Sequence, residues 1–384
     1  MLDRHSARCR PGARAGRIAK TAARAAALLA LLAGGSAAAA ESAGAATWTV
    51  AQPPFTTPLG DNVPFAPLYG ISAISTKDVW AVGEVSGTPL TDDWNGTRWS
   101  RVALPSGPCS VFENDCVLTG VSGDSASDVV AVGNAIINSD SAAGWIAEPI
   151  AFHWNGKAWA PMPVPAGASD DAFEHVQAFS PTDAWAVGVG DTATGATVAA
   201  EQWNGAAWTT VDTGFSTTNN LDVAAISGSS STDVWVVGET TTGGYTNRQF
   251  TSVALHYNGS NWSQIPVPDG SGLVDVFSLS PSSAWAVAAD GSILSWNGSA
   301  WTVLTQLSGA KLVAALSPTD VWVEGVVAIA HYNGSSWTTA PVPAGFDTPT
   351  GGAAGLTPGR VWFAGAAYLS NGDEVPAVLS TTNG

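Results

Sequence analysis

Two polar stretches of the chain combine aromatic rings with acids between segments of alternating apolar residues. With Asp191 they supply the side chains best suited to bind a ligand: Trp145, Tyr245, Phe250, Asp140, Glu148, Asp191, Glu239 and Arg248. Aromatic rings beside a few convergent polar groups suit stacking on a sugar and bonding its hydroxyls. We therefore predict a ligand site there. The alternative is that these rings only cap the loops against the strands beneath.

A repeat must position these residues. One element is a Ser-x-x-Asp turn followed by an apolar strand centred on Trp, and seven copies lie 37 to 55 residues apart. A second element, Asn-Gly between two strands, follows each of the first six copies. Alternation of large and small apolar residues indicates sheets buried on both faces, and Asn-Gly favours a two-residue type I′ turn. Each repeat thus predicts four antiparallel strands, a to d, which make one propeller blade.

The two ends of the repeat region complement each other. The seventh copy ends where its strand d should follow, and residues 46–50 match other d strands such as 207–211. We therefore predict an all-β, seven-bladed β-propeller of four-stranded antiparallel blades, with 46–384 as a single domain. The N-terminal strand d pairs with strand c at 375–380, so that 46–54 and 352–384 share the last blade. This closure leaves no open blade edge.

The repeat resembles known propellers at these residues. The b strand with its Asn-Gly-x-x-Trp hairpin is similar to BNR/Asp-box and photosystem II assembly-factor-like propellers, here in a secreted bacterial form. In the Asp-box an Asp stands five residues before the Trp. This chain has aromatic residues there, Trp94, Trp154, Trp203, Tyr257, Trp296 and Tyr332, so sialidase activity is not implied. Residues 284–301 resemble a tectonin repeat, from a family that includes lectins. The resemblance implies the fold and leaves the function open.

Metal chemistry has little support in the sequence. His153, His256 and His331 occupy one repeat position on different blades, too far apart to share a zinc ion. We interpret the position as one that tolerates half-exposed polar residues. Asp170, Asp171 and Glu174 could bind calcium in a d–a connection, although a solvated loop is the simpler interpretation. We predict no metal and no cofactor.

The N-terminal region is typical of a secretory signal. Seven basic residues precede an apolar run at 25–32 and small residues at 37–40, and cleavage could follow Ala40 or Ala45. We thus expect residues 1–45 to be a signal peptide and the protein to be extracellular, with no membrane span after cleavage. Beyond it, seven basic residues face 29 acids, a net charge of about −22, which disfavours nucleic acid. Outside the cytoplasm, Cys109 and Cys116 predict a disulfide, with two free thiols as the alternative.

Connection lengths suggest where a ligand docks. The a–b and c–d turns are short and alike, whereas the b–c loops range from 290–292 in blade five to 134–149 in blade two and 239–251 in blade four. The b–c and d–a connections share one face, and function concentrates on variable loops. We predict a monomeric, non-catalytic binding or scaffold module for an extracellular glycan or protein. The alternative is a sugar-active enzyme, a glycosidase or lyase, using two loop carboxylates about 5–10 Å apart.

Overall fold

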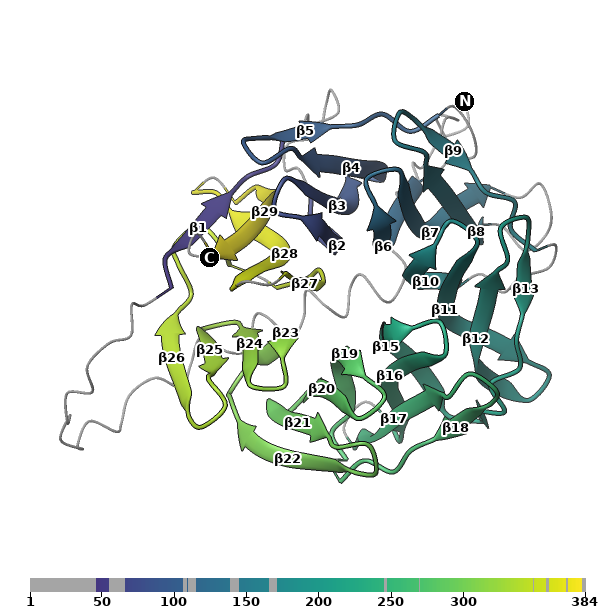
Figure 1. Ribbon diagram of the computed structural model, residues 1–384. Coiled ribbons are helices and arrows are strands. Elements are labelled where there is room, and N and C mark those ends of the chain that lie inside the picture. The colour runs from purple at the N-terminus through teal and green to yellow at the C-terminus, as the bar shows by residue number, and fades with distance from the viewer. Residues whose placement is uncertain are drawn as a thin grey trace, which may run out of the picture. The chain divides into compact units, whose positions relative to one another are not determined.

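The computed structural model describes most of the chain after residue 45. The described residues are 46–54, 66–105, 109, 115–138, 145–165, 171–244, 247–268, 270–347, 349–356, 359–370 and 372–381. Their strands form seven antiparallel sheets of four strands, one of which carries a short fifth strand. The sheets follow one another around a ring (Figure 1). The predicted seven-bladed propeller is therefore confirmed. Within these ranges no helix is long and apolar enough to span a bilayer.

The strands run a to d in chain order within each blade. Blade 1 comprises β2 (Leu68–Ser75), β3 (Asp78–Val85), β4 (Thr88–Trp94) and β5 (Trp99–Arg101), and blade 2 comprises β6 (Asp115–Ser125), β7 (Asp128–Asn138), β8 (Trp145–Trp154) and β9 (Trp159–Pro161). Blade 3 comprises β10 (Asp171–Ser180), β11 (Asp183–Thr192), β12 (Gly195–Trp203) and β13 (Trp208–Thr210), with β14 (Ser216–Thr217) added beside β12. Blade 4 comprises β15 (Asn220–Ser230), β16 (Asp233–Thr242), β17 (Gln249–Tyr257) and β18 (Trp262–Gln264), and blade 5 comprises β19 (Leu273–Ser280), β20 (Ser283–Ala288), β21 (Ser292–Trp296) and β22 (Trp301–Gln306). Blade 6 comprises β23 (Ala310–Ser317), β24 (Asp320–Gly325), β25 (Ala328–Tyr332) and β26 (Trp337–Pro341).

Blade 7 joins the two ends of the described chain. It comprises β27 (Ala353–Leu356), β28 (Arg360–Tyr368), β29 (Glu374–Thr381) and β1 (Trp48–Ala51). Trp48 pairs with Thr381 and Ala51 with Val378, as Figure 1 shows where the two ends of the colour range meet. The predicted pairing of the N-terminal strand with strand c is confirmed, and no blade is left without its outer strand.

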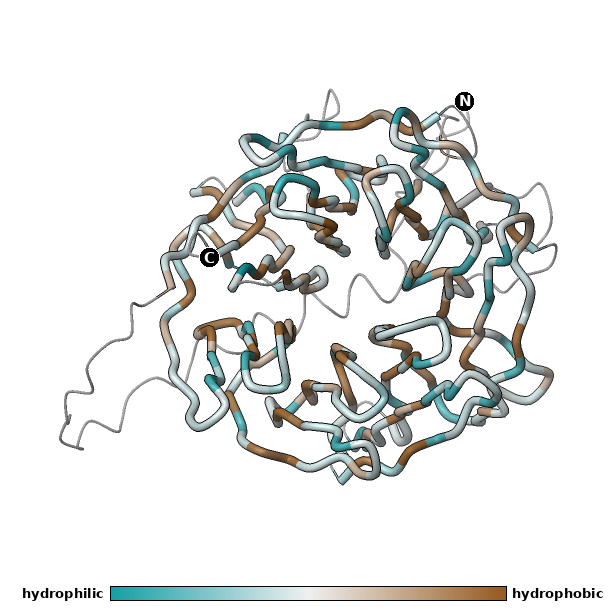
Figure 2. Tube along the Cα trace, in the orientation of Figure 1, coloured by the Kyte–Doolittle hydropathy of each residue, from teal (hydrophilic) through white to brown (hydrophobic). Residues whose placement is uncertain are grey.

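Pairs of tryptophans hold neighbouring blades together. A strand-b Trp of one blade meets a strand-d Trp of the next edge to face, as Trp80 meets Trp159 and Trp235 meets Trp301, with ring centroids 5.1 and 5.0 Å apart. In blade 2 the strand-b position holds Val130, and Trp208 of blade 3 meets Phe173 of its own blade instead. Hydrophobic stretches accordingly recur on the strands of every blade, between hydrophilic turns (Figure 2). The ring of cores depends on these contacts because no blade can bury its faces alone.

The Asn-Gly turns differ from the prediction. In blade 1 the last residue of strand c, Trp94, pairs with the first residue of strand d, Trp99. Four residues, not two, therefore separate the two strands. Asn95 Oδ1 accepts hydrogen bonds from the backbone N–H groups of Thr97 and Arg98, and only the glycine has a positive φ, 91° at Gly96. The Asn side chain thus replaces a backbone carbonyl in the turn, so a type I′ geometry is not needed.

The long b–c loops are mostly strand. Strands β7 and β8 pair out to Asn138 and Trp145, and β16 and β17 pair out to Thr242 and Gln249. The loops predicted at 134–149 and 239–251 were wrong in extent, because most of their residues continue the antiparallel ladder as hairpins. These hairpins project from one face of the ring, which we call the hairpin face. The face that carries the a–b and c–d turns is the turn face.

Candidate functional site

The predicted ligand residues lie on the hairpin face of consecutive blades. Glu148 is exposed on β8, Asp191 is exposed on β11, and Glu239 is partly buried on β16. Arg248 precedes β17, and Phe250 lies on β17 with 41% of its surface exposed. Asp140, Tyr245 and the side chain of Trp145 lie outside the described residues, so the aromatic part of the predicted site stays a prediction.

The exposed large apolar side chains lie mainly on the hairpin face, which the sequence analysis did not predict. Seven large hydrophobic residues are more than 40% exposed in the described part of the chain. Five of them lie on b–c hairpins of blades 4, 6 and 7: Phe250, Val326, Val327, Tyr368 and Leu369. The other two, Val303 and Leu304, lie on the outer strand β22. Exposed apolar residues that gather on one face mark an interaction surface more often than scattered ones do.

Charge is also distributed unequally between the two faces. Acids occur at the hairpin-face ends of the strands in most blades: Glu84, Glu148, Asp191, Asp222, Glu239, Asp290, Asp347, Asp373 and Glu374. In the described ranges that face has two Lys or Arg residues, Arg248 and Lys311. The turn face holds four, Lys77, Arg98, Lys157 and Arg360. The turn face also has acids, among them Asp78, Asp124, Asp128, Asp183, Asp233 and Asp320, but it has fewer acids and more bases, so the hairpin face is the more electronegative of the two.

Several of the hairpin-face groups are partly buried where the inner strands begin. Tyr69 donates its hydroxyl hydrogen to Glu84 Oε1 at 3.2 Å, and burial together with Glu84 and Glu374 raises the pKa of this phenol. Burial lowers the pKa of Lys311, whereas Glu239 opposes that shift. Burial raises the pKa of Asp275 to about 7, against hydrogen bonds from the Val313 and Val276 amides.

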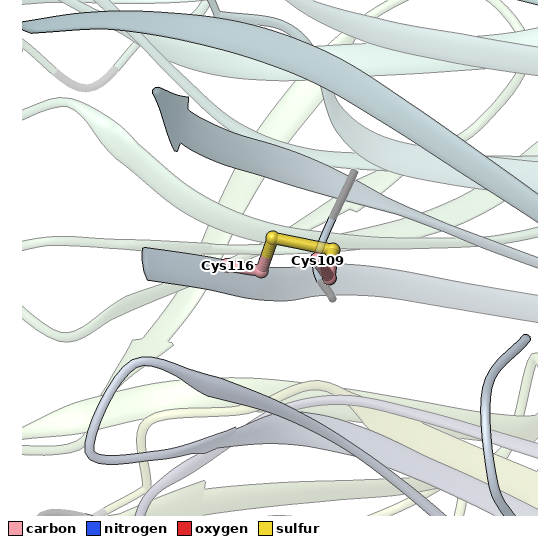
Figure 3. Close-up of a disulfide and its surroundings, with 2 residues drawn as sticks. All are labelled: Cys109 and Cys116. Carbon is pink, nitrogen blue, oxygen red and sulfur yellow. A yellow bond between two sulfur atoms is a disulfide. The ribbon is translucent and has the colours of Figure 1, made fainter. Parts of the chain in front are cut away.

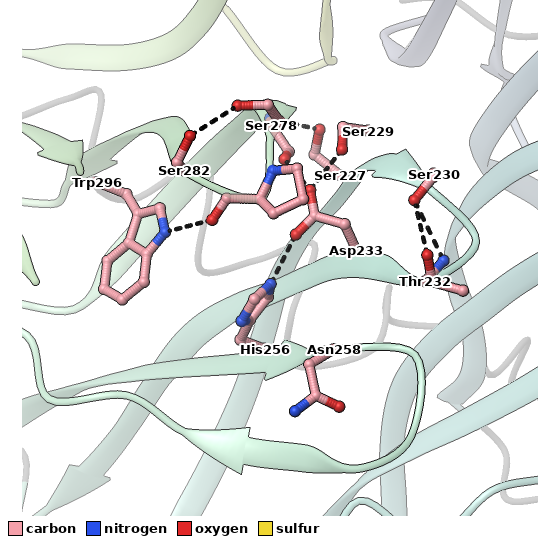
Figure 4. Close-up of polar contacts among 12 residues, drawn as sticks. Ser227, Ser229, Ser230, Thr232, Asp233, His256, Asn258, Ser278, Ser282 and Trp296 are labelled. Atoms are coloured by element: carbon pink, nitrogen blue, oxygen red, sulfur yellow. Dashed lines mark hydrogen bonds and ion pairs between the residues drawn. The ribbon is translucent and has the colours of Figure 1, made fainter. Parts of the chain in front are cut away.

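The histidines belong to the turn face and have a structural role. His153, His256 and His331 each hydrogen-bond through Nε2 to the Asp of their own blade's Ser-x-x-Asp turn, at 2.7 to 2.9 Å. Figure 4 shows His256 directed at Asp233. Burial would raise the pKa of Asp233, but hydrogen bonds from His256, Ser229 and Ser278 outweigh it, and the net shift is downward. The His–Asp hydrogen bond at this position ties the a–b turn to strand c, and we call such a tie a lock.

The indole groups of strand c make a second lock. Trp94, Trp154, Trp203 and Trp296 donate Nε1–H to backbone carbonyls of the a–b turn in the same blade, at 3.0 to 3.2 Å. The same Trp positions are those where the Asp-box would have its Asp. These contacts explain why the turn face is uniform, and they leave it few positions free to vary.

The predicted disulfide is present. Cys109 and Cys116 are joined, with their Cα atoms 5.6 Å apart, and the bridge fixes the connection into β6 (Figure 3). Cys116 is buried in the core between blades 1 and 2. The calcium alternative for Asp170, Asp171 and Glu174 is not tested, because Asp170 and the side chain of Asp171 lie outside the described residues. In the part that is described, no three His, Cys, Asp or Glu residues are grouped as metal ligands.

Comparison with solved structures places the chain among propellers. A structure described as YCF48 bound to D1 peptide superimposes with a TM-score of 0.58 and 16% identity, covering 88% of this chain and 95% of that one. YCF48 from Cyanidioschyzon merolae gives 0.52 and 16%, covering 88% and 98%, and the WD40 propeller domain of Doa1 gives 0.53 and 11%, covering 88% and 98%. These likenesses establish the fold, and they agree with the resemblance to assembly-factor-like propellers. No family model and no curated protein matches the chain.

Proposed function

We propose that this chain is an exported, non-catalytic binding propeller whose ligand docks on the hairpin face. One observation carries the proposal: exposed large apolar side chains gather on the b–c hairpins of blades 4, 6 and 7. A soluble domain gains nothing in folding from such residues, and their exposure is explained if a ligand covers them. The opposite face consists of short turns whose residues are needed for turn geometry and for the two locks.

A protein or peptide ligand fits this face better than a glycan. Of the five exposed residues three are aliphatic, Val326, Val327 and Leu369, and aliphatic groups bury apolar side chains rather than stack on sugar rings. The acids of the same face favour a ligand with positive charge. A propeller of the same fold, YCF48, has been solved with a peptide bound, which supports a peptide as the ligand class. A glycan remains an outcome of the test below.

Export is supported by two features of the chain. Residues 1–45 have the basic, apolar and small-residue order of a signal peptide. The disulfide between Cys109 and Cys116 is of a kind that persists in oxidising compartments. Intact-mass analysis of protein recovered outside the cells tests the point: the proposal requires a chain that begins at Glu41 or Ala46, and recovery of the uncleaved chain contradicts it.

The docking face is tested with paired variants of the mature protein. The wild-type mature protein would be assayed for binding to a glycan array and to a random peptide library, and for glycosidase activity. Each assay would be repeated with V327S/L369S. Removing two exposed aliphatic side chains from a buried contact should weaken binding by about tenfold or more. The matched control is V303S/L304S, which removes the two exposed residues of β22 on the outer wall and should leave affinity unchanged.

The outcomes separate the proposals. Binding that only the hairpin variant weakens supports the hairpin face, and the array that reports it identifies the ligand class. Binding that only the control variant weakens moves the site to the outer wall. Turnover of a glycoside substrate by the wild-type protein contradicts the non-catalytic role and favours the sugar-active enzyme.

A further inference from the structure

Glu324 breaks the repeat. It is the second residue after the central Trp of strand b in blade 6, where blades 1 to 5 have valine and blade 7 has alanine: Val82, Val132, Val187, Val237, Val287 and Ala364. All of those side chains are fully or almost fully buried. A carboxyl group thus stands at a position that the fold otherwise fills with a small apolar group. Residues that break a local rule without compensation are found most often at functional sites.

The Glu324 side chain points at blade 7. Its strand partners are Leu312 on β23 and Ile329 on β25, and directly paired residues share a face of the sheet. Both belong to the hydrophobic cluster that blade 6 forms with blade 7. Two residues earlier, Trp322 packs against Trp48 of blade 7 at 5.4 Å. Glu324 therefore lies in the seam between the two blades.

Among the residues that the structure describes, this carboxyl group has no hydrogen-bond partner. The residue is 0% exposed, and neither of its carboxyl oxygens accepts or donates a hydrogen bond within the described part of the chain. Burial raises the pKa of the group well above its ordinary value, which favours the protonated form. A buried polar group without a partner is costly, so a group that supplies the missing contact would be held strongly.

Within the described residues, the seam is the one joint of the seven whose inner strands share no hydrogen bond. Hydrogen bonds link the inner strands, or the residue leading into them, at the other six: Gly123 N to Ser72 Oγ, Ala178 N to Ser122 Oγ, His175 Nε2 to Val223 O, Ser278 N to Ser227 Oγ, Val313 N to Asp275 Oδ2 and Thr350 Oγ1 to Leu68 O. In the described residues none joins β23 to β27, and β27 is the shortest inner strand, with 4 residues.

Exposed apolar residues flank the seam on both sides. Val326 and Val327 follow Glu324 after one residue, Gly325, in the hairpin between β24 and β25. Leu369 follows the end of β28, on the b–c hairpin of the neighbouring blade, whereas Tyr368 is paired with Glu374 on the face of β28 that is turned to blade 1. Three of the five exposed apolar residues of the hairpin face therefore lie on the hairpins of the two blades that form this joint.

We propose that the seam between blades 6 and 7 receives a lysine or arginine side chain of a peptide ligand, with Glu324 as its counter-ion. The idea rests on the proposed function and specifies its ligand. Aliphatic neighbours of the basic residue cover Val326, Val327 and Leu369, and the hairpins part to admit the basic group. Glu324 releases its proton to solvent as the ion pair forms, which gives the buried carboxylate the opposite charge that it needs.

The test compares peptide selections on full-length mature variants. A random peptide library on phage is selected against the wild-type protein, E324Q, E324V, V327S/L369S and the outer-wall control V303S/L304S. Wild type and control should enrich sequences with Lys or Arg flanked by aliphatic residues. E324Q and E324V should keep the aliphatic preference and lose the basic one, with at least tenfold weaker binding of the wild-type consensus peptide. E324V, which carries the residue of blades 1 to 5, should unfold at a higher temperature than wild type, which establishes that it folds.

Other results overturn one proposal or both. If E324V and E324Q still enrich basic residues as wild type does, while V327S/L369S loses enrichment, Glu324 is not the counter-ion and the docking face stands. If V327S/L369S enriches the same peptides as wild type, the docking face fails as well. Enrichment of acidic peptides by wild type contradicts the ligand chemistry directly.

Discussion

Buried carboxyl groups are the residue-scale feature that bears most on this propeller's behaviour. Asp92 is 0% exposed and pairs through Oδ1 with Arg101 Nε at 2.9 Å, yet burial raises its pKa to about 6 against the attraction of that arginine. The pKa of Asp275 reaches about 7 for the same reason. Each carboxyl group loses hydration when the protein folds, so its pKa differs between the folded and unfolded states. Each group therefore makes the free energy of unfolding depend on pH.

Stability should fall as pH rises from about 4 to about 7. The folded-state pKa values of Asp92 and Asp275 are above the unfolded value of 3.8, so their stabilising contribution is fully present below pH 3.8 and is lost as pH passes the folded values. A tenfold change in the proton affinity of a carboxylate corresponds to about 1.4 kcal/mol, so the two groups together lower the free energy of unfolding by roughly 3 kcal/mol or more. Urea unfolding at a series of pH values measures this.

A matched pair of variants assigns the effect. D92N keeps the shape of the protonated acid and should flatten the profile between about pH 4 and pH 6. D124N alters an exposed aspartate and should leave the profile unchanged. A wild-type profile that rises across this range would show that other groups dominate.

Replacing Glu324 by valine should stabilise the fold. The change removes a buried carboxyl group without partners and restores the residue of the repeat, so we expect the free energy of unfolding to rise by about 1 to 3 kcal/mol. Guanidinium unfolding at neutral pH measures it. Destabilisation by E324V would mean that the carboxyl group has a structural partner, and would remove the reason to look for a ligand there.

At the scale of elements, each blade holds its a–b turn by side chains from strand c. In blade 3, Trp203 Nε1 donates to Pro181 O at 3.1 Å, and Gln202 reaches Asp183 in the same turn. The Ser hydroxyl of the Ser-x-x-Asp motif adds a local bond, from Thr182 N to Ser180 Oγ. The residues of the Ser-x-x-Asp motif thus hold the two turns of the blade together rather than bind a ligand.

Removing one such lock should weaken the blade measurably. W203F deletes the bond to Pro181 and part of a ring contact with Trp208 at 5.5 Å, and we expect a loss of about 1 to 2 kcal/mol. Thermal unfolding with T209A, an exposed position on β13, as control measures it. An unchanged midpoint for W203F would show that the lock contributes nothing to stability.

The elements were predictable to the extent that the repeat constrains them. Seven blades, four strands each and the pairing of Trp48 follow from copies of one pattern. The prediction for the Asn-Gly turn was wrong because Asn95 uses its side-chain oxygen, a local choice that the dipeptide does not reveal. The long hairpins were predicted as loops because polar, Thr-rich residues such as 240–242 have no apolar alternation even though they pair as strands.

The candidate site was predictable only as a face. Exposure of Val327 or Leu369 depends on what the neighbouring blade covers, which no local pattern encodes. Glu324 did leave a signal: the sequence VWVEG at 321–325 has an acid where the VWAVG of 79–83 has a core valine. Comparison of the copies position by position would have found it before the structure did.

At the scale of the whole molecule, closure by β1 holds the ring. Trp48 packs against Trp322 at 5.4 Å and Phe363 at 6.1 Å, so it joins blade 7 to blade 6 at the joint that has no inner hydrogen bond in the described residues. W48A should therefore lower the free energy of unfolding by about 2 to 4 kcal/mol. T49A, on the exposed side of the same strand, should cost less than about 1 kcal/mol, and equal effects of the two changes would contradict the role of the Trp contact.

The two faces of the ring differ in what they can do. The turn face repeats one construction seven times, with small departures, and its polar groups are bonded to one another. Within the described residues, the hairpin face carries most of the exposed apolar side chains and an excess of acids, and two of its hairpins belong to the blades whose joint has no inner hydrogen bond. A ligand that binds there can gain apolar contact and charge pairing without disturbing the locks that hold each blade.

Hydrogen–deuterium exchange of the mature protein, with and without a selected peptide, tests the location of function most directly. If the hairpin face binds the ligand, amide exchange slows in residues 326–328 and 369–373, which include or adjoin the exposed apolar residues of blades 6 and 7. Exchange in the c–d turns at 95–98 and 258–261 stays the same. Protection confined to those turns, with unchanged hairpins, would contradict the account.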